Sequence, residues 1–130
     1  MRSRAIVRPN PDDRLSPAWS EEMARARLAR AIDDQKAEWR HLERAHILSQ
    51  PLVLPHVRTH LAMLAAALRR HDRHEAAGQL LRLVLAGPGS LTGRYPVGNT
   101  GGADVGAFTP MPIPEDLRRI LDNDAEEALR

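Results

Sequence analysis

Apolar residues recur at helical spacing early in the chain, and this periodicity predicts an all-α fold. Ser16-Pro17 marks the start of a helix, because serine is a good N-cap and proline suits the first helical position. The pattern continues to about Gln50, so we predict one long first helix over residues 16–50. The apolar positions that share one face of this helix are Leu28, Ile32, Trp39 and Leu42.

Prolines and a capping motif divide the following residues into two more helices. The segment PLVLP (51–55) interrupts the first helix, and a second helix is expected over about 55–71. Asp72 and Glu75 form the D-x-x-E pattern of a capping box, which predicts a third helix over about 72–86. Because the connections are short, we expect a small antiparallel bundle of three main helices.

The second helix has apolar residues on two adjacent faces, which predicts that it is packed on both sides. With the third helix it forms a hairpin that resembles one tetratricopeptide-type unit in packing style, although no second repeat follows. The leucine-rich stripe comprises Val57, Leu61, Leu64 and Leu68, the second stripe comprises His56, His60, Met63 and Ala67, and the inward positions of the third helix are Ala76, Leu80, Leu83 and Val84.

Residues 87–114 form a long Gly/Pro-rich segment that contains seven of the eight glycines and five of the ten prolines. Its apolar residues are atypical of a disordered linker, so we predict an ordered strap laid across the bundle. The strap lacks the phosphate-loop pattern, and Pro114 starts a short last helix. The expected apolar anchors of the strap are Tyr95, Val97, Val105, Phe108, Met111 and Ile113.

These patterns predict one helical domain with a tail at each end. Residues 1–15 lack periodicity and are expected to be a mobile tail. The domain itself spans 16–121, and residues 122–130 are a C-terminal tail or a frayed helix end.

Polar residues on the inward side of the first two helices indicate a metal site. Glu43 and His46 are three residues apart, and His56 and His60 are four apart, so each pair shares a helix face. An antiparallel turn near residue 53 brings the two pairs opposite each other. Three imidazoles and one carboxylate suit a single divalent ion such as zinc, iron, nickel, cobalt or copper. A di-metal centre is not expected, because a second E-x-x-H is missing.

The alternative to a metal site is a purely structural network, in which the histidines and Glu43 satisfy one another by hydrogen bonds. Two further polar residues, Gln79 and Asp104, bear on this site. Gln79 lies one helical turn after Glu75 and is placed to tie down the strap. Asp104 is the only carboxylate of the strap and would complete the site if the strap folded over the histidines.

Composition removes several other classes of function. The chain has no cysteine, which excludes disulfides, zinc–thiolate sites and cysteine nucleophiles. Its 19 basic and 17 acidic residues give a net charge of only +2, and the few aromatic residues are not interleaved with arginines, so no nucleic-acid partner is expected. No signal peptide or membrane span is recognisable, and a cytoplasmic location is expected.

Four segments together resemble a bacterial family catalogued as a domain of unknown function, DUF3703. They are WRHLERAHILSQ (39–50), HVRTHLAML (56–64), EAAGQ (75–79) and PVGNTGGADVGAFTPMPIPEDL (96–117). The resemblance covers about residues 35–121 and implies a small, free-standing helical domain behind an unrelated N-terminal tail. It implies no activity and assigns no catalytic residue.

Three functions are therefore open. The first is a metal-binding protein that uses Glu43, His46, His56 and His60. The second is a non-catalytic interaction module in which the hairpin and the strap contact a protein partner. The third is an enzyme that acts on a small anionic molecule held by Arg58, Arg70 or the strap glycines.

Overall fold

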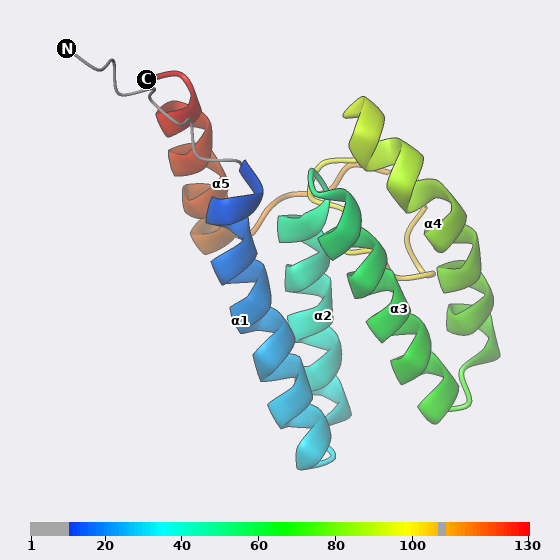
Figure 1. Ribbon diagram of the computed structural model, residues 1–130. Coiled ribbons are helices and arrows are strands. Elements are labelled where there is room, and N and C mark those ends of the chain that lie inside the picture. The colour runs from blue at the N-terminus through cyan, green and yellow to red at the C-terminus, as the bar shows by residue number, and fades with distance from the viewer. Residues whose placement is uncertain (1–10, 107–108) are drawn as a thin grey trace.

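The computed structural model describes residues 11–106 and 109–130, and within these ranges it contains five helices and no strand (Figure 1). The all-α prediction is thus confirmed. Helices α1 to α4 run alternately up and down, and α5 lies beside α1 (Figure 1). Residues 1–10 of the predicted tail and the predicted anchor Phe108 lie outside the described residues. The helices are α1 (Pro11–Ala31), α2 (Gln35–Ser49), α3 (Val53–Arg69), α4 (Arg73–Thr92) and α5 (Glu115–Ala128).

The predicted first helix is two helices, so the expectation of three main helices is wrong. A tight turn at Asp33 and Asp34 separates α1 from α2. Asp33 adopts a left-handed backbone with φ of 58°, and the Asp34 carboxylate caps α2 by accepting a hydrogen bond from the Ala37 amide at 3.0 Å. The chain therefore reverses, and Leu28 and Ile32 are exposed at the end of α1 instead of facing a core. Helix α1 also begins at Pro11, before the predicted start at Ser16.

Polar contacts hold α1, α2 and α5 together around a small apolar core. Glu22 of α1 accepts hydrogen bonds from Arg44 Nε at 2.9 Å and from His41 Nδ1 at 2.7 Å. Arg44 also pairs with Asp116 of α5. Since α5 continues to Ala128, residues 122–128 extend this helix. The buried apolar residues between the three helices are Trp19, Ala45, Ile47, Leu48 and Leu117.

Helix α4 begins as the sequence predicts but ends later. The Asp72 carboxylate accepts a hydrogen bond from the Glu75 amide at 3.0 Å, which confirms the N-cap. The helix then continues through Pro88 to Thr92 and ends at Gly93, whose φ is 67°. The predicted end at residue 86 is therefore wrong, and the strap proper spans residues 93–114.

The outer side of the α3–α4 hairpin is apolar and exposed. The histidine-bearing stripe of α3 is buried against α2 and α4, as predicted. The leucine-rich stripe is not buried. None of the described elements covers the outer side of α3 and α4. Helix α3 does lie between α2 and α4, as predicted for a helix packed on both sides, but the leucine-rich stripe is not one of its buried faces. Exposed fractions are 50% for Leu61, 59% for Leu68, 57% for Leu80 and 72% for Val84.

Candidate metal centre

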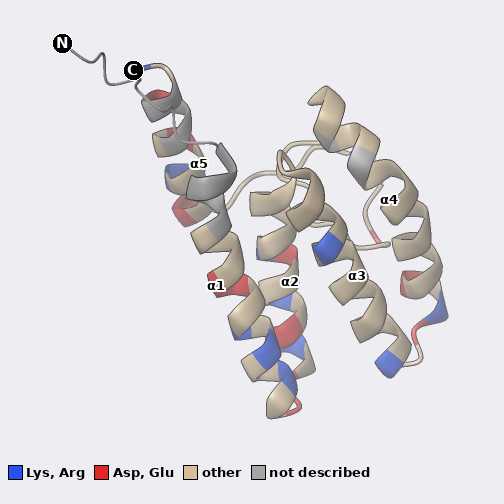
Figure 2. Cartoon of the chain, in the orientation of Figure 1, with Lys and Arg blue, Asp and Glu red and all other residues tan. Residues whose placement is uncertain are grey.

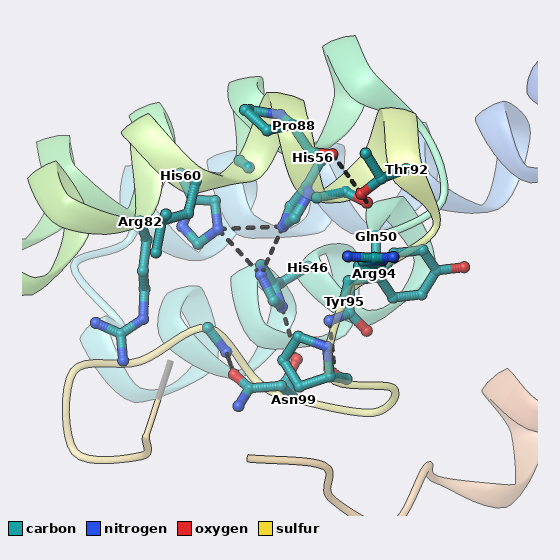
Figure 3. A pocket seen from close by; sticks show the side chains of 15 residues that line it. His46, Gln50, His56, His60, Arg82, Pro88, Thr92, Arg94, Tyr95 and Asn99 are labelled. Carbon is teal, nitrogen blue, oxygen red and sulfur yellow. Dashed lines mark hydrogen bonds between the residues drawn. The ribbon is translucent and has the colours of Figure 1, made fainter. Parts of the chain in front are cut away.

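Three histidines from two helices meet in the interior of the bundle (Figure 3). His46 lies in the last turn of α2, and His56 and His60 lie one turn apart on α3. The connection at residues 50–52 is short, so α3 returns antiparallel to α2 and carries its two histidines past His46. All three side chains are buried. The predicted convergence of these histidines is confirmed, and they are called the histidine triad below.

The triad presents three ring nitrogens to a common point. The Nε2 atom of His46 lies 3.0 Å from Nε2 of His56 and 3.1 Å from Nε2 of His60, and the last two atoms are 3.2 Å apart. The three atoms thus form a nearly equilateral triangle. Three nitrogens bound to one ion at about 2.05 Å are separated by about 2.9 Å at octahedral angles and about 3.3 Å at tetrahedral angles. The observed distances lie between these two values.

The opposite ring nitrogens of His46 and His60 are held by oxygen acceptors. His46 Nδ1 donates to the Asn99 carbonyl of the strap at 2.6 Å. His60 Nδ1 lies 2.6 Å from Gln79 Oε1. The orientation of this amide is fixed, because Gln79 Nε2 donates to Glu75 Oε1 at 2.6 Å and to the Gly101 carbonyl at 2.8 Å. The proton of each ring therefore sits on Nδ1.

His56 completes the same arrangement. It hydrogen-bonds the backbone of Ala86 on α4, and this bond favours the protonated ring. Because His56 Nε2 faces the other two rings, the nitrogen that remains for Ala86 is Nδ1. Three Nε2 lone pairs then point at one another with no proton between them.

The electrostatic environment keeps the three rings neutral. Burial is the main cause that lowers the pKa of His56 and of His60 to about 4. Burial, followed by the charges of His60 and His56, holds the pKa of His46 well below its ordinary value of 6.5. At neutral pH the triad is therefore a set of uncharged imidazoles, which is the form that binds metal ions.

A cavity of about 280 Å³ adjoins the triad. All three imidazoles line it, so an ion at the triad would have coordination positions open toward this space. Helix α4 supplies one wall, and the strap supplies another (Figure 3). None of the described residues that line the cavity is acidic, whereas Arg82 and Arg94 both line it.

The structure places the predicted carboxylates outside the triad. Glu43 is half-buried on α2, and its side chain bonds Thr100 of the strap. Burial, and next the nearby charge of Glu75, raises the pKa of Glu43. Among the described residues, the group whose ligand atoms converge contains His46, His56 and His60 and does not contain Glu43. Asp104 is exposed on the strap, where its carboxylate lies 3.7 Å from His74.

Helix α4 and the strap together provide the residues that fix the triad, and most of these were not expected. The predicted tie between Gln79 and the strap is confirmed by its bond to Gly101. Asn99 is fully buried and holds the strap closed, because its side-chain amide donates to the carbonyls of Gly106 at 2.9 Å and Thr109 at 2.7 Å. Val97, in contrast, is an expected anchor that is exposed. Hydrogen bonds from buried polar groups therefore hold this part of the strap.

Residues 13–121 match the family described as "Protein of unknown function (DUF3703)". The chain belongs to this family. The match to DUF3703 begins at residue 13, well before the expected boundary near residue 35, so α1 is part of the family domain. No curated protein matches the chain, and no solved structure does. In the part of the chain that the structure describes, no helix is both long and apolar enough to cross a membrane.

Proposed function

We propose that this DUF3703 protein binds one divalent metal ion through Nε2 of His46, His56 and His60. The observation that carries the proposal is the convergence of the three Nε2 atoms, which lie 3.0–3.2 Å from one another. Neutral imidazoles fixed in this way have no hydrogen bond to give one another, and their lone pairs repel. A cation at their centre converts this unfavourable contact into three bonds.

The chemistry of the donors defines the class of ion. Three neutral nitrogen ligands suit zinc, cobalt, nickel, copper or iron, and they disfavour magnesium and calcium, which prefer oxygen. The partners of the opposite ring nitrogens support this proposal, because metal-bound histidines commonly donate their other N–H to a carbonyl or carboxylate oxygen. Here the acceptors are Asn99, Gln79 and Ala86.

Elemental analysis and titration test the proposal on the full chain without a histidine tag. We expect the purified protein to bind one equivalent of zinc or cobalt, and we expect binding to raise its melting temperature. His46→Ala should abolish this binding. The control is His74→Ala, which removes an exposed ring on α4. Binding that is equal in the two variants, or absent from the wild-type protein, would contradict the proposal.

An interaction role has a separate observation in its favour, namely the exposed apolar face of the α3–α4 hairpin. Its α3 residues repeat every three and four positions, as in a coiled coil. Leu80, Val84 and Leu91 of α4 follow the same register. Figure 2 shows that the charged residues gather mainly on α1, α2 and α5, with few on α3 and α4. The α3 seam comprises Leu54, Val57, Leu61, Leu64 and Leu68.

The occupant that this face fits is the same face of a second copy. Seven of its side chains are at least half exposed, and at roughly 100 Å² apiece they present about 700 Å², close to the 800 Å² or so that each partner buries in a stable interface. Two such hairpins, related by a two-fold axis, form a four-helix bundle. The seven residues are Leu54, Leu61, Leu68, Leu80, Leu81, Val84 and Leu91.

A further inference from the structure

The charges around the triad are unbalanced once an ion is bound. A divalent ion held by three neutral imidazoles keeps its full charge of two. Arg82 adds a buried cation to the cavity, and its guanidinium donates to the carbonyls of Gly78 at 3.1 Å and Val105 at 2.6 Å, which are uncharged partners. Arg94 adds a second cation at the exposed rim. Glu75 acts on Arg82 electrostatically but does not line the cavity.

Glu75 offsets part of the charge of Arg82, but the described lining of the cavity supplies no carboxylate, so the cavity favours an anionic ligand. An excess of buried positive charge is costly in a low-dielectric interior unless an anion compensates it. The open coordination positions of the ion face this same cavity. An anion there would bind the metal directly and would also be attracted by the positive charges of the two arginines.

The remaining walls of the cavity indicate what else the ligand contains. Leu85, Ala86 and Pro88 of α4 present apolar surface, and Tyr95 adds an aromatic ring from the strap. Cavities for drug-sized ligands are commonly about 300–1,000 Å³. At about 280 Å³ this cavity falls just below that range and suits a small molecule.

We infer that the cavity takes a small organic monocarboxylate, whose carboxylate binds the triad-held metal ion and whose apolar part contacts α4 and Tyr95. This inference rests on the proposed metal site. The expected cations Arg58 and Arg70 have no part in it. Arg58 is exposed on α3 and does not line the cavity, and Arg70 lies over the Trp39 ring at 4.6 Å.

Visible spectroscopy of the cobalt(II)-loaded protein tests this inference. Benzoate is the probe, and benzamide is its neutral counterpart of nearly the same shape. We expect benzoate to change the cobalt d–d absorption in a saturable way and benzamide to leave it unchanged. Arg94→Gln should weaken benzoate binding by about fivefold, because one charge at the rim is lost. Arg58→Gln is the matched control and should bind benzoate like the wild-type protein.

The outcomes separate the two proposals. If no bound-cobalt spectrum forms, the metal site itself is wrong. If cobalt binds but benzoate does not alter its spectrum, the metal site stands and the carboxylate inference is overturned. The inference also fails if benzamide acts like benzoate, or if Arg94→Gln binds benzoate with unchanged affinity.

Discussion

Gln79 connects the strap to the histidine triad through one amide group. Its oxygen accepts from His60, and its nitrogen donates to Gly101 of the strap and to Glu75. The side chain is fully buried, so none of these bonds can be replaced by bulk water. Gln79 is therefore a positioning residue that sets the tautomer and the orientation of His60, one of the proposed metal ligands.

Replacing Gln79 by leucine tests this role. The change keeps a similar volume but removes the acceptor for His60 Nδ1, so we expect metal affinity to fall by about 10- to 100-fold. Glutamate at this position should preserve the acceptor and recover part of the affinity. Titration with zinc measures both effects, and Gln35→Leu, at the exposed start of α2, serves as the control. Equal zinc affinity in the leucine variant and the wild-type protein would show that the bond from His60 to Gln79 is not needed.

The sequence predicts some residues of the histidine site and not others. The triad was predictable, because helix periodicity and a short connection fix which faces of α2 and α3 meet. Glu43 was predicted as a fourth metal ligand from the same periodicity, yet its side chain bonds Thr100 and lies near the charge of Glu75. The position of Asn99 could not be inferred, because its partners depend on how the strap folds. An asparagine among glycines was the available signal in the sequence.

At the scale of elements, the strap depends on one close approach of backbone to side chain. Gly101 has a φ of 84°, and a Cβ atom at this position would lie 2.7 Å from Cδ2 of His46. The His46 ring is fixed by its bond to Asn99 and cannot move aside. Gly93 also has a positive φ, but no atom lies within 4 Å of the position of its Cβ.

These two glycines form a matched pair for mutation. Gly93→Ala should lower the free energy of unfolding by about 1–2 kcal/mol, since only backbone strain is added. Gly101→Ala should lower it by roughly 2–5 kcal/mol, because a steric clash of about 1–3 kcal/mol adds to the same strain. Chemical denaturation measures both values. Zinc affinity should fall only in the Gly101 variant, and similar effects of the two substitutions would argue against close packing of the strap on His46.

Helix boundaries were the least predictable part of the elements. The break at Asp33 and Asp34 was missed because periodic apolar residues continue across it, although two adjacent aspartates are a turn and capping signal. The end of α4 was placed too early because Pro88 and its flanking glycines suggested a loop. In the fold, the packing of α4 beside α3 outweighs the cost of the helical hydrogen bond that is lost because Pro88 has no N–H.

At the scale of the whole molecule, the neutral triad makes stability depend on pH. The pKa values of His56 and His60 are about 4 in the folded chain, below the ordinary 6.5, so the unfolded chain binds more protons between these values. Stability is then fully present above pH 6.5 and is lost as the pH falls toward 4, by roughly 1.4 kcal/mol per pH unit for each ring that titrates. Denaturation of the metal-free protein at several pH values measures this slope. A flat profile would contradict neutral burial of the triad.

The exposed outer face of the α3–α4 hairpin is the surface through which we expect two copies of the chain to associate. A monomer would leave the seven apolar side chains in water, whereas a two-fold dimer buries them, so we expect a particle of twice the 14.5 kDa chain mass by light scattering. Leu61→Glu combined with Val84→Glu places charges on the apolar face of the hairpin and should give a monomer that still binds zinc, since neither residue lines the cavity beside the triad. Leu28→Glu changes an equally exposed leucine on α1 and should leave the dimer intact. A wild-type protein that stays monomeric at high micromolar concentration would rule out this dimer and favour a different protein partner for the same face.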